Sequence, residues 1–116
     1  MDSMERLSAL KAEVLRLNRR IAAMEAFMAD GASSDGKVDM AFIVEAVSRL
    51  TGVSVRQIMS YSRRYEIAAV RQRAYLACHR NGHSFAAIGR HFNRDHTTIM
   101  SGVKRADARE KSVAMG

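Results

Sequence analysis

The sequence predicts an all-α fold, in which a small helical domain is preceded by an N-terminal amphipathic helix. Three observations lead to this class. Apolar residues recur along the chain at the three- and four-residue steps of helix surfaces. The 116 residues are 47% hydrophobic and contain no proline, which suffices for one core but not for a large enzyme cleft. Near the C-terminus, two helical patterns are separated by a very short turn.

The first segment, residues 1–30, is predicted to form a single heptad helix. Apolar residues alternate at steps of three and four, at Leu7, Leu10, Val14, Leu17, Ile21, Met24 and Met28. Two β-branched residues at a positions with leucine at two d positions favour a parallel two-stranded coiled coil. Two interpretations stay open: residues 7–28 pair with a second copy or a partner helix, or they lie against the domain of their own chain.

Residues 31–37 are rich in Gly, Ser and Asp and are predicted to form a linker. Gly31, Gly36 and Lys37 also match the GxxxxGK spacing of a phosphate-binding loop. However, Val38 stands where Ser or Thr would hold magnesium, and a helix precedes the loop where a buried strand is required. We therefore expect no nucleotide site and no cofactor.

Three helices are predicted after the linker. Apolar spacing indicates the first over 42–50, which Gly52 ends. Ser54 is a suitable N-cap for a short second helix. A basic stretch over 61–65 then leads into a longer third helix from Glu66 to about Arg80.

The C-terminal part is predicted to contain two helices joined by a tight turn. Ser84 can cap a helix over 85–92, and a second helix is expected from about Asp95 to Arg109. The second helix would bury Ile99, Val103 and Ala106 and leave mainly polar residues off that face, namely Thr97, Thr98, Ser101, Lys104 and Arg105. Two short helices with so short a turn and a polar first turn on the second describe a helix-turn-helix.

Positive charge is concentrated in the second half of the chain. The formal net charge is +7, and the segment 56–109 holds eleven basic residues against three acidic ones. Such a local excess suits a polyanion as partner, although a solvated basic face without a partner would give the same count. No apolar run approaches a membrane span, no signal peptide is evident, and no basic segment has the apolar face of a surface-lying membrane helix. We expect a cytoplasmic protein without membrane contact.

Enzyme and metal chemistry are not expected. Cys78 and His79 are adjacent, but neighbouring residues on a helix point apart and cannot form a thiol–imidazole pair. His79 and His83 are four residues apart, yet Gly82 is expected to end the helix between them and no third ligand is evident. The single cysteine excludes an intrachain disulfide.

The run from Ile88 to Ile99, IGRHFNRDHTTI, closely resembles the C-terminal DNA-binding domain of the bacterial chromosomal replication initiator DnaA. The family hallmark I-G-x-x-F-[G/N]-x-R-D-H-T-T-V is present with a turn one residue shorter, and Asn93 stands where two glycines are common. Residues 62–64 and 71–77 look like the family's basic loop and the helix after it. The resemblance spans about 38–111 and implies a stand-alone DNA-binding domain without the initiator's ATPase.

The resemblance also implies which residues contact DNA. The family's Asp-His-Thr reads bases in the major groove, and these residues are here Asp95, His96 and Thr97. An arginine of the basic loop enters the adjacent minor groove; it is Arg63, or Arg64 if the register slips by one. Candidates for phosphate contacts are Arg64, Arg71, Arg73, Arg90, Arg94, Thr98, Lys104 and Arg105. Asp95 could instead be only a helix N-cap, and His96 and the arginines could be merely solvated.

The sequence thus predicts a heptad helix over 1–30, a linker over 31–37, a helix-turn-helix domain over 38–111 and a tail over 112–116. The expected function is sequence-specific binding of double-stranded DNA in the control of transcription or replication, without catalysis. The N-terminal helix would provide a homodimer or partner contact. The alternative is a protein-interaction module that uses the N-terminal helix and binds DNA only weakly and without specificity.

Overall fold

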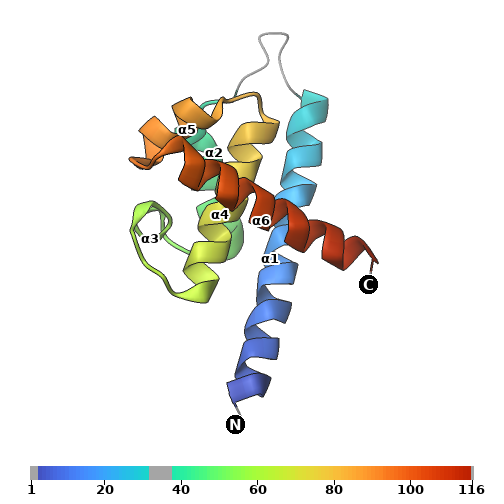
Figure 1. Ribbon diagram of the computed structural model, residues 1–116. Coiled ribbons are helices and arrows are strands. Elements are labelled where there is room, and N and C mark those ends of the chain that lie inside the picture. Colours follow the sequence, from blue (N-terminus) through green and yellow to red (C-terminus); the bar gives the residue numbers. More distant parts are fainter. Residues whose placement is uncertain (1–2, 32–37, 116) are drawn as a thin grey trace.

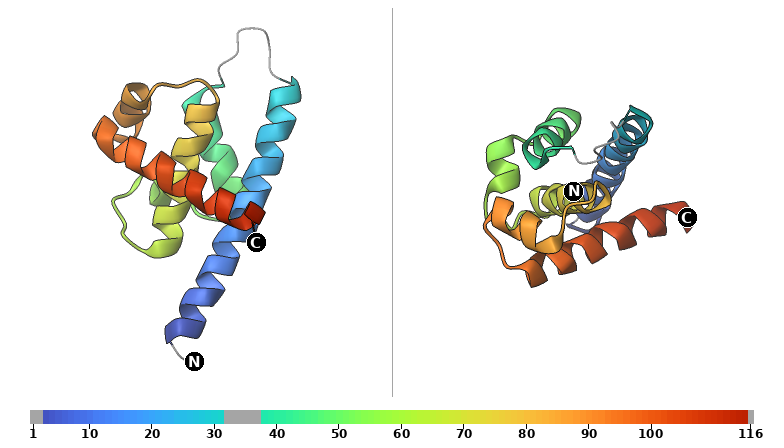
Figure 2. Two further views of the ribbon diagram at one scale, coloured as in Figure 1. Left: turned by 45° about the vertical axis from the view of Figure 1, so that its right-hand side comes forward. Right: turned by 90° about the horizontal axis from the view of Figure 1, so that it is seen from above.

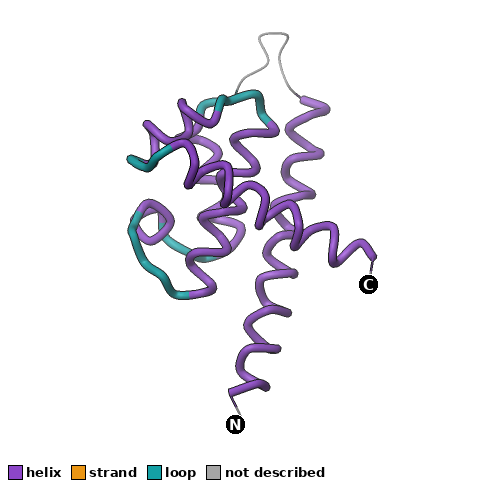
Figure 3. Tube along the Cα trace, in the orientation of Figure 1, coloured by secondary structure: helices purple, strands orange, loops and turns teal. Residues whose placement is uncertain are grey.

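The computed structural model describes residues 3–31 and 38–115, and within these ranges all regular structure is helical (Figure 3). The all-α fold class is therefore confirmed. The six helices are α1 (Ser3–Gly31), α2 (Met40–Thr51), α3 (Val55–Met59), α4 (Tyr65–Arg80), α5 (Phe85–Phe92) and α6 (His96–Met115). Apart from Gly31, the predicted linker over 31–37 lies outside the described residues.

Helix α4 lies at the centre of the domain, and each of the other five helices packs against it (Figure 2). Ten of its 16 residues are buried, so it has almost no solvent face of its own. Around it, the core is completed by apolar side chains from the neighbouring helices, among them Ile43, Val47, Ile58, Ile88, Phe92 and Ile99. The Tyr75 ring of α4 meets the Phe92 ring of α5 edge-on, with centroids 4.8 Å apart.

The two N-caps that the sequence predicted, Ser54 and Ser84, are confirmed by their hydrogen bonds. Ser54 accepts from the backbone N–H of Gln57, whose side chain in turn accepts from the Ser54 N–H, which makes a complete capping box. Ser84 accepts from the Ala87 N–H at the start of α5. Gly52, with φ of 78°, ends α2 in the left-handed conformation that glycine adopts without strain.

Helix α1 lies against its own domain in its middle and projects from the domain at its N-terminal end (Figure 1). Val14, Leu17 and Ile21 are buried, which corresponds to the intramolecular alternative for this part of the heptad. Leu7 and Leu10 on the projecting end are 44% and 36% exposed. The apolar stripe of the heptad is therefore buried in the middle of α1 and exposed at its N-terminal end. The side chain of Met28 is not among the side chains that the structure describes.

Helix α6 is longer than the sequence predicted. It begins at His96 and continues to Met115, so the expected end at Arg109 is wrong, and the expected tail is helical up to Met115. Two ionic contacts stabilise the added turns: Lys111 pairs with Asp107 at 3.0 Å, and Glu110 pairs with Arg80 of α4 at 2.6 Å. In Figure 1 α6 crosses α1, against which it packs.

Candidate nucleic-acid interface

The turn between α5 and α6 comprises only residues 93–95, and one left-handed residue reverses the chain. Asn93 has φ of 57° and ψ of 52°, a conformation that asparagine tolerates better than most residues with a side chain. The Arg94 N–H then donates to the Gly89 carbonyl at 2.8 Å and closes the end of α5. A single asparagine thus makes the whole reversal, which accounts for a turn one residue shorter than the hallmark.

Gly89 allows the turn to pass close to α5. A Cβ atom at this position would lie 2.5 Å from the Arg94 carbonyl oxygen and 3.5 Å from the His96 nitrogen. Because the first of these is a backbone atom of the turn, it cannot move without displacing the start of α6. The absence of a side chain at Gly89 therefore fixes how α6 leaves α5.

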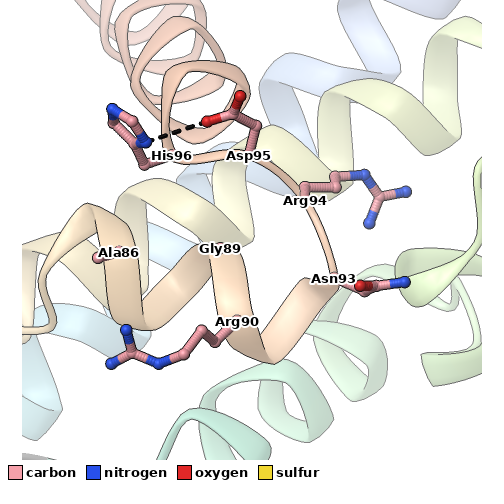
Figure 4. Close-up of a pocket in the computed structure, with 7 residues that line it drawn as sticks. All are labelled: Ala86, Gly89, Arg90, Asn93, Arg94, Asp95 and His96. Carbon is pink, nitrogen blue, oxygen red and sulfur yellow. Dashed lines mark ion pairs between the residues drawn. The ribbon is translucent and has the colours of Figure 1, made fainter.

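The first turn of α6 presents polar side chains to solvent. Asp95 acts as an N-cap, since its carboxylate accepts from the Thr97 N–H at 3.2 Å. The same Oδ1 atom lies 3.0 Å from His96 Nδ1, and the two side chains are 65% and 62% exposed. Figure 4 shows them on the α6 side of a shallow hollow, with Arg90 on its α5 side. When Nδ1–H of neutral His96 donates to Asp95, Nε2 is left as an acceptor.

A polar groove of about 360 Å³ lies between α6 and α4. Its lining combines the hydroxyl groups of α6 with three arginines, and comprises Arg71, Gln72, Tyr75, Arg94, Thr97, Thr98, Ser101, Gly102 and Arg105. Hydroxyl and guanidinium groups in this arrangement suit the oxygens of a phosphate backbone.

Arg71 lies at the buried side of this groove and is only 7% exposed. Its Nε donates to the Ile58 carbonyl at 2.9 Å, whereas its buried Nη2 has no hydrogen-bond partner among the described residues. Burial, and next the positive charge of Arg94, lower the pKa of Arg71 from its ordinary value. An anion in the groove would relieve the repulsion between the two cations.

The loop over 60–64, between α3 and α4, lies on the same side of the domain as the start of α6 (Figure 1). Arg63 and Arg64 in this loop are exposed, and Arg64 pairs with Glu66 at 2.7 Å. The loop and the turn before α6 are joined by a hydrogen bond from Arg94 Nη2 to the Ser60 carbonyl at 2.5 Å. The loop that carries the exposed arginines is thus bonded to the turn that precedes the polar start of α6.

Residues 40–106 match the family model described as bacterial dnaA protein helix-turn-helix. The match covers more than half of the chain.

The chain belongs to the bacterial DnaA helix-turn-helix family.

No solved structure matches the chain. The family is defined by a DNA-binding domain and not by a catalytic one, so this member binds DNA, and its partner is a double-stranded nucleic acid. In the DnaA-type domain described here, the helix-turn-helix consists of α5 and α6.

One of the phosphate contacts predicted from the sequence is wrong. Arg73 has no exposed surface and pairs with Glu25 of α1 and, at 3.0 Å, with Glu110 of α6. Arg71, which was predicted together with Arg73, does line the groove. The two side chains lie on opposite faces of α4, because two residues along a helix correspond to a rotation of about 200°. Positive charge on α4 is therefore divided between the groove and the opposite, buried side.

The remaining predicted residues come from the loop over 60–64, from the turn before α6, and from α4, α5 and α6. The first turn of α6 and the groove bring together Asp95, His96, Thr97, Thr98, Arg71, Arg94 and Arg105, and the loop supplies Arg63 and Arg64. Lys104 is exposed one position before Arg105, and Arg90 is exposed on α5. Which of these residues contact DNA stays a prediction.

Sequence reasoning left two residues out of the predicted contacts. Ser101 was placed on the polar side of the last helix but not among the site residues, and it lines the groove; its position four residues after Thr97 is a signal for a shared helix face. Tyr61 contacts Asn93, 32 residues further along the chain, and also Arg94, and no local pattern indicates these contacts.

The residues considered for other chemistry are held by structural contacts. Cys78 is buried, and burial together with the charge of Glu25 raises its pKa to about 12, which leaves the thiol unreactive near neutral pH. His79 stacks on Phe85 with ring centroids 4.3 Å apart, and His83 Nε2 lies 2.6 Å from the Val38 carbonyl oxygen. Over residues 3–31 and 38–115 no three potential ligands cluster around a metal position, and none of the helices could cross a membrane.

Proposed function

We propose that this protein is a sequence-specific regulator of transcription or replication that acts on double-stranded DNA at the bacterial nucleoid. The observation that carries the proposal is the exposed Asp95-His96-Thr97 turn, which lies beside a groove rich in arginine and on the same side as the exposed Arg63. In this proposal the start of α6 enters the major groove and reads base edges. Arg63 enters the adjacent minor groove, where A·T-rich DNA concentrates negative potential.

The chemistry of the first turn is suited to reading bases. His96 offers Nε2 as an acceptor for a base amino group, and the Thr97 methyl group can pack on a thymine methyl group. Asp95 already accepts two contacts from its own helix, so we propose that it orients His96 and uses its remaining lone pairs on a cytosine amino group. Helix capping and base reading are compatible roles for one carboxylate.

Backbone contacts are assigned to the groove and its rim. Arg71, Arg105 and Thr98 line the groove, and Arg64 and Lys104 are exposed. We assign these five residues to phosphate oxygens, which fix the orientation of the domain without reading sequence. The proximity of the like charges of Arg71 and Arg94 supports an anion at this place.

Replacing His96 or Thr97 by alanine is expected to weaken binding to the preferred duplex by about 1–3 kcal/mol, because each variant loses a base contact. Binding to random duplex should change little. The preferred duplex is first selected from a random oligonucleotide pool with the full chain, and affinities are then measured by fluorescence anisotropy. Equal losses on both duplexes would show that these residues do not read bases.

Arg105→Ala is the matched control on the same helix. Because a phosphate contact carries no sequence information, this variant should weaken both duplexes alike and reduce the slope of log affinity against log salt by about 1. A variant series in which His96→Ala and Arg105→Ala behave identically would contradict the division into reading and backbone residues.

A second function, protein interaction, is favoured by the projecting end of α1. Leu7 and Leu10 share the heptad stripe, and both are exposed at the end of α1 that lies outside the domain. We propose that this end pairs with α1 of a second copy and so places two recognition helices on one duplex. A stripe of this length gives a weak dimer, because only about two turns of each helix are available.

Sedimentation velocity of the full chain tests this pairing. We expect dimers at tens of micromolar, and we expect the double variant Leu7→Ser, Leu10→Ser to remain monomeric with an unchanged melting temperature, since neither side chain belongs to the core. A monomeric wild-type chain at these concentrations contradicts the dimer.

A further inference from the structure

Tyr61, Asn93 and Arg94 join the loop over 60–64 to the turn of the helix-turn-helix. The Arg94 guanidinium lies over the Tyr61 ring, 4.4 Å from its centroid. The Tyr61 hydroxyl group donates to the Asn93 carbonyl at 3.2 Å and accepts from Asn93 Nδ2 at 3.1 Å. In Figure 4, Asn93 and Arg94 point away from Arg90 and His96, so they leave the exposed first turn of α6 open.

Arg94 also connects three backbone segments by itself. Its Nη1 donates to the Phe92 carbonyl at 2.9 Å, and its Nη2 donates to the Ser60 carbonyl at 2.5 Å. The first acceptor ends α5, the second follows α3, and Arg94 itself precedes α6. These contacts use two of the five N–H donors of the guanidinium, one on each terminal nitrogen, which leaves fewer for a phosphate contact than the sequence implied.

Apart from the contacts of Tyr61 and Arg94, the loop is held by short-range contacts. Tyr61, Arg63 and Arg64 are exposed. The Ser62 N–H donates to Ser60 Oγ, the Arg64 N–H donates to Ser62 Oγ, and the Arg64 side chain pairs with Glu66. Arg63 stands two residues after Tyr61, and His96 stands two residues after Arg94. A connection between Tyr61 and Arg94 therefore determines how far Arg63 lies from the first turn of α6.

We propose that Tyr61, Asn93 and Arg94 form a loop–turn clamp that fixes the separation between Arg63 and the first turn of α6, and thereby the distance in the DNA site between its minor-groove and major-groove parts. The inference rests on the proposed function, because it requires both grooves to be read. In this proposal Tyr61 and Arg94 are positioning residues that act through Arg63 and His96. Without the clamp, the loop must be ordered during binding, and ordering one backbone residue costs about a factor of ten in affinity.

The test uses the full chain and two duplexes: the preferred one, and the same duplex with the A·T pairs of its minor-groove part replaced by G·C. Tyr61→Ala should bind the preferred duplex about tenfold more weakly than wild type and bind the replaced duplex as wild type does. Its preference between the two duplexes should therefore fall about tenfold. Tyr61→Phe, which keeps the ring under Arg94 but loses the hydroxyl contacts, should fall between wild type and Tyr61→Ala.

Two further variants separate positioning from other roles. Arg94→Lys keeps the charge but cannot bridge two carbonyls and cover the ring, so the clamp predicts a loss like that of Tyr61→Ala, whereas a phosphate role predicts nearly wild-type binding. Tyr65→Ala is the matched control, because this tyrosine lies under Arg109 instead, and its preference between the duplexes should be unchanged.

Hydrogen exchange of the free protein gives a readout that does not depend on DNA. Amides of residues 61–64 should exchange faster in Tyr61→Ala, while the amides of α4 remain protected. Unchanged exchange in the loop, or equal weakening on both duplexes, overturns the clamp. If the wild-type chain itself does not distinguish the two duplexes, the minor-groove part of the proposed function fails. The hydrogen-exchange result then still tests the clamp, which requires faster exchange of the loop amides in Tyr61→Ala.

Discussion

Replacing Arg73 by alanine is expected to lower the free energy of unfolding by about 3–5 kcal/mol, the usual cost of removing one partner from a buried ion pair. Arg73 is completely buried at the centre of the domain, between Glu25 of α1 and Glu110 of α6. Those carboxylates are themselves only 14% and 27% exposed. Without the guanidinium they would face each other across a cavity, with Arg80 as their remaining cationic partner.

Urea unfolding followed by circular dichroism measures this effect. Arg80→Ala is the matched control, because Arg80 contacts the same two carboxylates from a position that is 39% exposed. Solvent screens its interactions, so a loss of about 1 kcal/mol or less is expected. If the two variants lose the same stability, the buried pairs of Arg73 do not have the importance that their burial indicates.

The Arg73 contacts make α1 part of the folding unit and not an appendage to it. The family match ends before Glu110 and begins after Glu25, yet both residues pair with an arginine inside it. Val14, Leu17 and Ile21 of α1 are buried against the same domain. A fragment limited to residues 40–106 would expose this apolar surface and leave Arg73 unpaired, and we therefore assign the DNA-binding unit to the full chain.

The sequence was sufficient to predict the helices, because each has a local signal. The caps at Ser54 and Ser84 and the left-handed ends at Gly52 and Asn93 are recognisable within four residues of sequence. The end of α6 was not recognisable, since no residue after Arg109 stops a helix and the contacts that extend it come from α4.

Burial of charge and contacts between distant segments required the structure. Arg71 and Arg73 carry the same side chain two residues apart, and contacts from distant segments distinguish their environments. Arg71 donates to the Ile58 carbonyl, whereas Arg73 pairs with Glu25, 48 residues before it, and with Glu110. The heptad of α1 was ambiguous for a physical reason: the same apolar stripe can cover its own domain or a partner. The local sequence around Tyr61 likewise does not predict its hydrogen bond to Asn93 in the turn before α6.

Gly89→Ala is expected to abolish sequence-specific binding, with a loss of a hundredfold or more on the preferred duplex. For the stability of the fold, helix propensity alone predicts that this substitution raises the free energy of unfolding by about 1 kcal/mol, because alanine is the better helix former. The structure reverses this expectation, since the new Cβ would lie 2.5 Å from the Arg94 carbonyl oxygen. Overpacking against backbone costs about 3 kcal/mol, so a net destabilisation of about 2 kcal/mol remains.

The effect on DNA exceeds the effect on stability because of where the clash falls. Relief requires the turn to move, and with it Asp95 and His96, so several base contacts of about 1–3 kcal/mol each are lost together. Gly52→Ala is the matched control: its Cβ meets open space, but φ is 78°, and the left-handed conformation costs about 1–2 kcal/mol. Two variants of similar stability should therefore differ widely in their binding to the preferred duplex. Binding by Gly89→Ala as tight as that of Gly52→Ala would mean that α6 does not need this angle to α5 to read DNA.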